Sequence, residues 1–477
     1  MRKITIALLV MFVSLGITQA KEAQPGAPGL GDSYFPDLGN GGYDVRHYTL
    51  NLDWDEATNV ISGAVTLEAT ATHDLSAFNL DFLGFDISAI RLDDAPAGFS
   101  RSGRELTIEA ADGLKTGQDF SLTIAYSGVP GDGVPRYYDV FARGWTRYEG
   151  GVYVASEPNG AAFWYPVNDH PLDKATYRFE ITVPQPYVVA ANGLLAETRE
   201  DDDTITYVWE SHDPIASYLV TVNIGSFVVE QTQGPDGLPI RNYFPPRVFQ
   251  QAIVTFHRTP EMIAFFSDMF GPYPFEAYGV VVADHNLSFA LETQTLSLFG
   301  SSAAAGGGNS ENVVAHELAH QWFGNSVSLA EWKDIWLNEG FATYAAALWL
   351  EHTQGAEAFD RYMRDLYLPL ATPALALGRF LPPGNPPPDN LFNGGVYVRG
   401  AWLLHALRLR IGDEAFFSVL RTYYDRYQYA NAATADFIAV AEEISGQDLA
   451  AFFESWLYDE RVPEVPEMGL KPLSPRR

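Results

Sequence analysis

The stretch HELAHQWFGN at residues 316–325, followed by WKDIWLNEGFA at residues 332–342, determines how the second half of this chain must fold. The first stretch lies within a helical pattern of apolar residues. Residues four apart on a helix face the same side, so His316 and His320 can reach one ion, while Glu317 points at the open position of that ion. The spacing therefore predicts a metal centre.

A third ligand can be sought by distance from this pair. Catalytic zinc usually takes three protein ligands and keeps one position open. A histidine six residues after His320 is excluded, because Ser326 stands there. Nineteen residues after His320 comes Glu339, which opens another predicted helix; its alternative role is a solvated acid in the first turn of that helix. We predict that His316, His320 and Glu339 hold one Zn²⁺ ion.

Composition limits the classes of partner. The chain has 477 residues, which favours two domains, and its 47% apolar residues are ample for folded cores. Asp and Glu number 60 against 30 Lys plus Arg, so the formal charge is -30, and nucleic acid and anionic lipid are poor partners. A cationic ligand fits better, unless the acidity serves only solubility. The absence of cysteine excludes disulfides, thiolate ligands and a cysteine nucleophile.

The first twenty residues have the pattern of a cleavable signal peptide. Arg2 and Lys3 precede an apolar run at residues 4–13, and small and polar residues follow up to Ala20. The alternative is an uncleaved anchor. We expect a secreted or periplasmic protein cleaved near Ala20, with residues 21–42 as a linker. No later apolar stretch reaches the length of a spanning helix, so no stable membrane insertion is expected, and the oligomeric state stays open.

Hydrophobic periodicity divides the rest into two domains of an α+β protein. Residues 43–245 alternate apolar and polar residues between turn signals, which predicts an antiparallel β domain. From residue 246 to residue 461 the period becomes that of a helix, and the Pro-rich tail at residues 462–477 is expected to lie over the surface or fray. Helices are predicted at 248–266, 313–322, 339–350, 400–410, 413–424 and 435–443, and strands at 278–282 and 294–298.

These motifs resemble the aminopeptidase N family of gluzincin zinc metallopeptidases, which also includes the leukotriene hydrolase with its dual activity. The resemblance is carried by HExxH, eighteen residues and then Glu, and runs from about residue 41 to residue 458. It implies an N-terminal β-sheet saddle domain followed by a mostly helical, thermolysin-like zinc catalytic domain. Longer members continue into a further β domain and a helical C-terminal domain. This chain is expected to stop short of both and to have a more open active site.

Three further segments extend the resemblance to single residues. FALETQT at residues 289–295 is similar to the family's Gly-Ala-Met-Glu-Asn motif, with Gly, Met and Asn replaced, and implies that Glu292 binds the α-amino group of the substrate. The Ser-Glu-Pro segment around Glu157 resembles the family's second amine-binding position. The Tyr-Val-Arg-Gly-Ala segment that begins at Tyr397 resembles Tyr-x-Lys-Gly-Ala, and implies that Tyr397 is the catalytic phenol.

The expected chemistry follows from these residue types. Zinc lowers the pKa of a bound water towards neutrality, and Glu317 would take that water's proton and pass it to the leaving amine. The Tyr397 hydroxyl would stabilise the oxyanion that forms. Asp334 and Asn338 are candidates to hydrogen-bond the ligands.

The function implied is a secreted zinc aminopeptidase that removes N-terminal residues from peptides or proteins. Two carboxylates, Glu292 and Glu157, would pin a cationic amine one residue from the scissile bond, which an interior segment cannot supply. The alternatives are a zinc endopeptidase with an open cleft, hydrolysis of an epoxide lipid, and a catalytically silent peptide-binding or scaffold protein.

Overall fold

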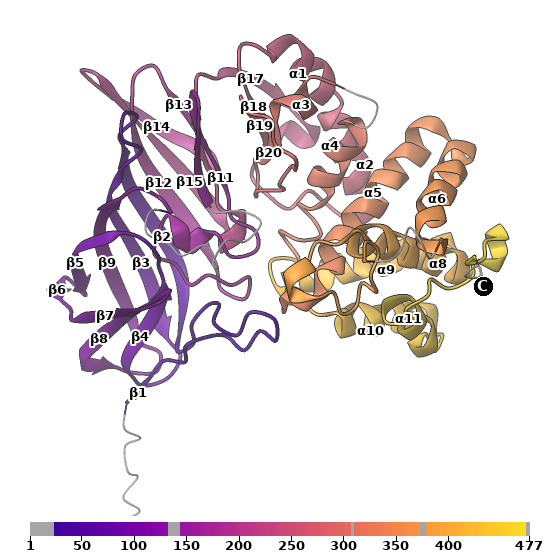
Figure 1. The fold of residues 1–477 in the computed structure, drawn as a ribbon, viewed down its shortest axis with the longest axis horizontal. Helices are drawn as coiled ribbons and strands as arrows, with labels where there is room; N and C mark the ends of the chain where they lie inside the picture. The colour runs from indigo at the N-terminus through magenta and orange to yellow at the C-terminus, as the bar shows by residue number, and fades with distance from the viewer. Residues whose placement is uncertain (1–22, 132–143, 307–309, 373–377, 474–477) are drawn as a thin grey trace, which may run out of the picture.

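The chain forms a β-rich half and a helical half that lie side by side (Figure 1). The computed structural model describes residues 23–131, 144–306, 310–372 and 378–473. The predicted signal peptide at residues 1–20 and the end of the tail lie outside these ranges. The two-domain α+β class expected from the sequence is confirmed.

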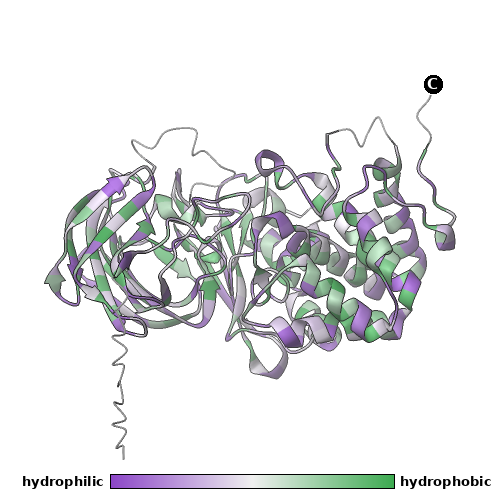
Figure 2. Cartoon of the chain, turned by 90° about the horizontal axis from the view of Figure 1, so that it is seen from below, coloured by the Kyte–Doolittle hydropathy of each residue, from purple (hydrophilic) through white to green (hydrophobic). Residues whose placement is uncertain are grey.

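An eight-stranded sheet forms the centre of the β-rich half. Its central strands, such as β2 and β12, bury alternate residues, so one face packs on the core, and Figure 2 shows hydrophobic and hydrophilic positions interspersed along the strands of this half. The sequence predicts an antiparallel domain, but β2 and β12 pair in parallel. Parallel pairing is possible here because a long segment of chain connects the two strands. In spatial order the strands are β14 (Leu194–Asp201), β15 (Thr204–Ala216), β12 (Lys174–Pro184), β2 (Tyr43–Trp54), β3 (Ile61–Ala71), β9 (Asp119–Gly128), β5 (Asp86–Leu92) and β6 (Ala95–Pro96).

Two four-stranded sheets complete this half. One consists of β1 (Gln24–Pro25), β4 (Leu75–Asp81), β8 (Glu105–Leu114) and β7 (Phe99–Ser102). The other consists of β10 (Gly144–Tyr148), β11 (Gly151–Ala155), β16 (Val222–Gly225) and β13 (Val188–Ala191). β11 ends two residues before Glu157, and so carries that residue towards the helical half.

A mixed four-stranded sheet belongs to the helical half, although its first two strands precede residue 246 and so lie within the predicted β domain at 43–245. Its strands are β17 (Val228–Gln233), β18 (Pro239–Phe244), β19 (Tyr278–Ala283) and β20 (Ser297–Gly300). The strand predicted at 278–282 is confirmed as β19. The strand predicted at 294–298 begins later, as β20, because the Leu296 amide donates to the Thr293 carbonyl oxygen at 3.0 Å and closes a turn there.

Ten α-helices are described in the second half, and most residues of the longest one, α5, are buried. They are α1 (Phe249–Phe256), α2 (Thr259–Phe270), α3 (Ser301–Ala304), α4 (Ser310–Ala319), α5 (Trp336–Gln354), α6 (Ala356–Ala371), α8 (Gly400–Ile411), α9 (Asp413–Tyr427), α10 (Thr434–Ser445) and α11 (Ala450–Leu457). The shorter elements are η2 (Ala161–Phe163), η3 (Ser217–Leu219), η4 (Pro235–Gly237), η5 (Trp332–Asp334), η6 (Pro388–Asn390), η7 (Gly395–Arg399), η8 (Pro466–Met468), β21 (Ser328–Leu329) and β22 (Asn431–Ala432).

One helix prediction is corrected by the structure. The single helix predicted at 248–266 is wrong, since α1 and α2 are separated at residues 257–258 and Pro260 lies in the first turn of α2. Helices α3, α6 and α11 correspond to no helix predicted from the sequence. The signal for α6 was present, because Phe359, Met363 and Tyr367 recur every four residues and are buried.

The described part of the Pro-rich tail lies on α6. The Tyr367 hydroxyl donates to the Pro463 carbonyl oxygen at 2.7 Å, and the Leu473 amide donates to the Ala371 carbonyl oxygen at 2.8 Å. The expectation that the tail covers the surface is thus confirmed for these residues. Among the described helices, none combines the length and the apolar character needed to cross a bilayer.

The backbones of α5 and α8 touch at two glycines. A Cβ atom added to Gly340 would lie 2.9 Å from the Gly400 backbone, a distance that side chains do not tolerate. Gly340 follows Glu339, and Gly400 comes three residues after Tyr397. The crossing therefore brings the third predicted ligand and the predicted phenol to the same place.

Candidate metal centre

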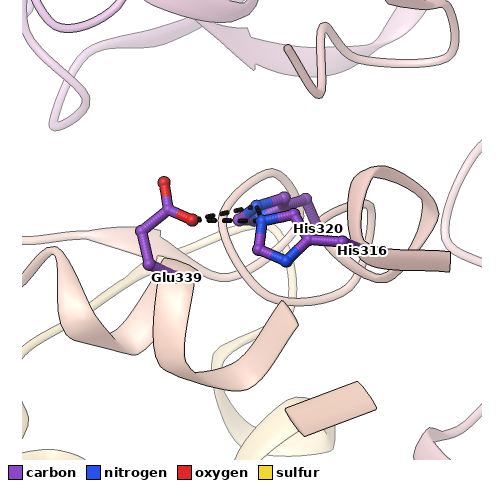
Figure 3. A group of neighbouring side chains, drawn as sticks. All are labelled: His316, His320 and Glu339. Atoms are coloured by element: carbon purple, nitrogen blue, oxygen red, sulfur yellow. Dashed lines mark hydrogen bonds and ion pairs between the residues drawn. The ribbon is translucent and has the colours of Figure 1, made fainter. Parts of the chain in front are cut away.

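The three predicted ligands meet at one point between α4 and α5. His316 Nε2 lies 3.2 Å from Glu339 Oε2, and His320 Nε2 lies 3.1 Å from His316 Nε2 and 3.5 Å from Glu339 Oε2 (Figure 3). Corners of a tetrahedron whose centre is about 2.0–2.1 Å away are about 3.3 Å apart. Two imidazole nitrogens that face each other at this distance need either a shared proton or a cation between them, and the carboxylate oxygen at the third corner favours the cation. The donor set and its spacing therefore fit a zinc ion.

Contacts on the far side of each imidazole fix its orientation. His320 Nδ1 lies 3.1 Å from the Phe323 carbonyl oxygen, which can only accept, so this nitrogen carries the proton and Nε2 presents its lone pair. His316 Nδ1 lies 3.5 Å from the Thr343 hydroxyl oxygen. Neither Phe323 nor Thr343 is among the residues predicted from the sequence, although Thr343 stands four residues after Glu339 on the same face of α5.

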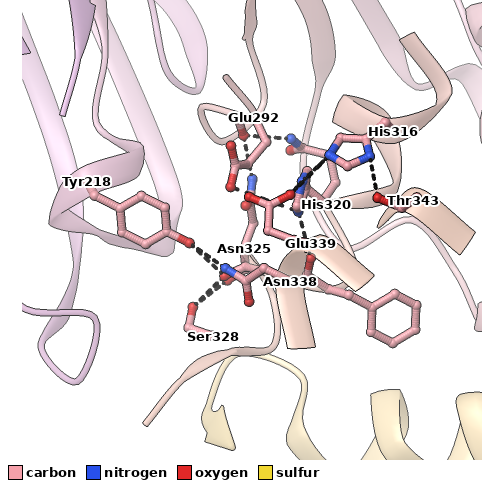
Figure 4. Close-up of polar contacts among 12 residues, drawn as sticks. Tyr218, Glu292, His316, His320, Asn325, Ser328, Asn338, Glu339 and Thr343 are labelled. Atoms are coloured by element: carbon pink, nitrogen blue, oxygen red, sulfur yellow. Dashed lines mark hydrogen bonds and ion pairs between the residues drawn. The ribbon is translucent and has the colours of Figure 1, made fainter. Parts of the chain in front are cut away.

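The two residues proposed for this orienting role bind elsewhere. Asp334 accepts a hydrogen bond from the Thr434 hydroxyl at 2.6 Å. Asn338 Nδ2 donates to the Tyr218 hydroxyl oxygen at 3.3 Å (Figure 4). Asp334 therefore braces the start of α5 against α10, and Asn338 joins α5 to the β-rich half.

Electrostatics favour positive charge at this point. Burial opposes charge on every group, and it lowers the pKa of His316. The carboxylates of Glu292 and Glu339 outweigh burial at His320 and raise its pKa to about 10, whereas the two imidazoles outweigh burial at Glu339 and lower its pKa to about 2. A cation is thus stabilised where the three ligands converge.

Glu317 and Tyr397 flank the ligand set without joining it. Glu317 is 6% exposed, and burial together with the carboxylates of Glu292 and Glu339 raises its pKa well above the usual value. Tyr397 lies in the π-helical turn η7, and its ring stacks on His316 with centroids 6.0 Å apart. Burial and the nearby carboxylates raise the pKa of Tyr397, so its hydroxyl stays protonated and can donate.

Glu157 and Glu292 are buried carboxylates from different halves of the chain. They are 3% and 2% exposed, and the Oε1 atom of each is buried with no hydrogen-bond partner among the described residues. Burial and neighbouring carboxylates raise the pKa of both. Buried polar atoms are normally satisfied, so these two oxygen atoms indicate a cationic ligand.

One pocket of about 540 Å³ gathers the whole predicted set. Its polar lining consists of Glu157, Glu292, His316, Glu317, His320, Glu339, Tyr397, Ser288 and Ser302. Apolar side chains form the rest of the wall, namely Leu287, Phe289, Ala290, Ala303, Val313 and Phe392. The sequence analysis had not placed this apolar wall, because its members come from loops and helices whose side chains meet only in the fold.

Comparison with known proteins agrees with this geometry. The model of the peptidase M1 N-terminal domain matches residues 45–219, and the model of the peptidase family M1 domain matches residues 254–456. Aminopeptidase M1-D of Oryza sativa subsp. japonica is 27% identical over 88% of this chain, and glutamyl aminopeptidase of Homo sapiens is 28% identical over 78% of it. The chain spans 50% and 40%, respectively, of the lengths of these two relatives.

Solved structures extend the match to a protein of similar size. The M1 zinc metallopeptidase of Deinococcus radiodurans is 31% identical, with a TM-score of 0.80, and the match covers 94% of this chain and 100% of that one. A mutant of the same protein bound to a Tyr-Ser-Ala substrate matches equally well, with a TM-score of 0.80. From the two family models and this full-length structural match, we conclude that the chain belongs to peptidase family M1 and has the fold of its two-domain zinc metallopeptidases.

Proposed function

We propose that this chain is a zinc aminopeptidase that removes single residues from the free N-terminus of peptides. The observation that carries the proposal is the pair of buried carboxylates beside the metal ligands, Glu157 and Glu292, each with an oxygen atom that accepts no hydrogen bond from the described residues. An α-ammonium group supplies the missing charge and hydrogen-bond donors. An interior peptide segment has no such group, so it would leave both carboxylates buried and unpaired.

The side chains around the centre supply the remaining chemistry. When bound, zinc lowers the pKa of a water molecule and polarises the peptide carbonyl group. Glu317 accepts the proton of the attacking water, as its raised pKa favours, and delivers it to the leaving nitrogen. The protonated Tyr397 hydroxyl donates a hydrogen bond to the oxygen on which negative charge develops. Glu157 and Glu292 hold the ammonium group and orient the first peptide bond.

We propose a single metal ion. Two groups of ligand atoms lie close together, and they share His320: one is His316, His320 and Glu339, and the other is Glu292, Glu317 and His320. The second group lacks a free imidazole lone pair, because His320 Nδ1 carries the proton that faces the Phe323 carbonyl oxygen. Metal analysis of the purified chain should therefore give one zinc per molecule.

The apolar wall suggests which first residues are accepted. Phe289, Val313 and Phe392 are partly buried and line the pocket beside the metal ligands. Within the described parts of the chain, no lysine or arginine lines this pocket. An apolar first side chain gains from burial here, whereas an acidic one meets carboxylates and finds no cation. We expect leucyl, methionyl and phenylalanyl substrates to be cleaved faster than glutamyl or aspartyl ones.

The test is a panel of aminoacyl chromogenic amides beside N-acetylated peptides, with chelator and zinc add-back. The proposal predicts cleavage of the free-amine substrates alone, loss with chelator and recovery with zinc. Cleavage of N-acetylated peptides would instead indicate an endopeptidase. If the zinc-loaded chain hydrolyses no substrate of the panel, a peptide-binding protein without catalytic activity is favoured.

Export is a separate proposal that rests on the residues 1–20 pattern alone. Expression of the full chain in a secretion-competent bacterium should yield a periplasmic or extracellular product, and intact mass should place its N-terminus near Lys21. A product that keeps residue 1 would contradict this part of the proposal.

A further inference from the structure

Glu292 is held by its backbone rather than by its side chain. Its carbonyl oxygen accepts one hydrogen bond from Asn325 Nδ2 at 2.8 Å (Figure 4). It accepts another from Gln321 Nε2 at 3.0 Å. Both amides come from the segment that immediately follows His320, and both side chains are fully buried. The segment that follows His320, the second histidine ligand, therefore also hydrogen-bonds the backbone of Glu292.

Gln321 makes a second contact that explains how the Glu292 segment keeps its shape. Its Oε1 atom accepts a hydrogen bond from the Thr295 amide at 2.9 Å. Thr295 has a φ of 65°, a left-handed conformation that β-branched residues rarely adopt. Arg241 Nη1 also donates to the Thr295 carbonyl oxygen at 3.0 Å. The turn that follows Glu292 is thus strained, and it is stabilised from outside.

Lys174 extends the arrangement to the β-rich half, which carries Glu157. The Lys174 ammonium group donates to the carbonyl oxygens of Asn325, Ser326 and Ala430 at 3.1, 3.0 and 3.2 Å. Lys174 is the first residue of β12 in the large sheet. The segment that contains Gln321 and Asn325 and that hydrogen-bonds Glu292 is therefore attached to both halves of the chain. The two amine-binding carboxylates come from different halves, and their separation depends on contacts of this kind.

We propose that Gln321 and Asn325 are positioning residues that fix Glu292 at the distance from the metal centre that one amino-acid residue requires. Lys174 braces the Asn325 loop against the half that carries Glu157. This inference rests on the proposed aminopeptidase function. In it, the two side-chain amides determine how far the cleaved bond lies from the free N-terminus. Neither amide contacts the substrate or the metal in this scheme.

The test compares Gln321→Met and Asn325→Leu, which keep side-chain size and remove the amide, with Asn431→Leu. Asn431 is a matched control, because its Nδ2 atom also joins the two halves, donating to the carbonyl oxygens of Pro171 and Leu329 at 2.8 Å each without contacting Glu292. For an aminoacyl amide we expect KM to rise about tenfold in each positioning variant, with kcat and zinc content little changed. Asn431→Leu should keep the wild-type KM.

Hydrogen exchange gives a readout that does not depend on activity. Backbone amides within residues 289–296 should exchange faster in Gln321→Met and Asn325→Leu than in the wild type or in Asn431→Leu. Unchanged exchange and unchanged KM would overturn the inference, and so would an equal effect in Asn431→Leu. If the wild type cleaves no aminoacyl amide, the proposed function fails, and exchange in this segment still decides whether the amides position Glu292.

Discussion

Replacing Glu157 with glutamine tests amine recognition with almost no change in shape. Glu157 is the cleaner of the two carboxylates to change, because Glu292 Oε1 lies 3.9 Å from His320 Nδ1 and influences a metal ligand. The amide keeps the volume and one acceptor oxygen of the carboxyl group, but loses the negative charge. A substrate ammonium group would then be held by Glu292 alone.

The structure predicts that Glu157→Gln lowers activity and raises stability. A hydrogen bond to a charged group contributes about 2 kcal/mol, so kcat/KM for a free-amine substrate should fall about 30-fold in Glu157→Gln. Burial and the carboxylates of Glu292, Glu339 and Glu317 raise the pKa of Glu157, so the folded chain favours its protonated form, whereas the unfolded chain is ionised at neutral pH. Glutamine removes that difference, and Tm at pH 7 should rise by about 2–4 °C per kcal/mol gained.

Steady-state kinetics and thermal unfolding at pH 7 measure the two effects on the same preparation. Glu149→Gln is a matched control, because Glu149 is exposed in the turn between β10 and β11 of the same half. The control should leave both quantities unchanged. A Glu157→Gln enzyme that keeps wild-type kcat/KM, or that loses stability, would refute the idea that this carboxylate is kept unpaired for a substrate amine.

Three further predictions concern single side chains. Tyr397→Phe should lower kcat by about 100- to 1,000-fold with little change in KM or zinc content, and steady-state kinetics with metal analysis would show it; a loss of zinc would contradict the assigned role. Burial raises the pKa of Glu105 to about 8, so stability should fall as pH rises from about 4.5 to 8, and Glu105→Gln should raise Tm at pH 8 but not at pH 4. Burial of Asp32 is outweighed by hydrogen bonds from His170 and the Trp332 amide, which lower its pKa to about 2, so Asp32→Asn should lower Tm much more at pH 7 than at pH 2, where most of this stabilisation is lost; equal shifts at both pH values would contradict this.

Local periodicity made the ligand set predictable from the sequence. His316 and His320 are one helical turn apart, so the formation of α4 alone brings them together. Glu339 required one further step, namely that the helix it opens packs against α4. The helical part of the fold was predicted for the same reason, and α6 was missed although its apolar residues recur every four positions.

Contacts between distant segments could not be predicted in this way. The parallel pairing of β2 and β12 depends on the whole excursion between them. Glu157 stands more than 150 residues before the metal ligands, and only a family resemblance linked it to them. The hydrogen bonds from Gln321 and Asn325 to the Glu292 carbonyl oxygen could not be predicted from a periodic pattern. They join two side chains to a backbone atom of another segment.

Three side chains are proposed to hold the metal, and Glu317, which lies beside them in the same pocket, is proposed to move the proton. The most direct test is to measure zinc content and aminopeptidase activity together in Glu317→Gln. We expect one zinc per chain, as in the wild type, with kcat lowered by about 10³-fold. Loss of zinc from this variant, or activity near that of the wild type, would contradict the assignment.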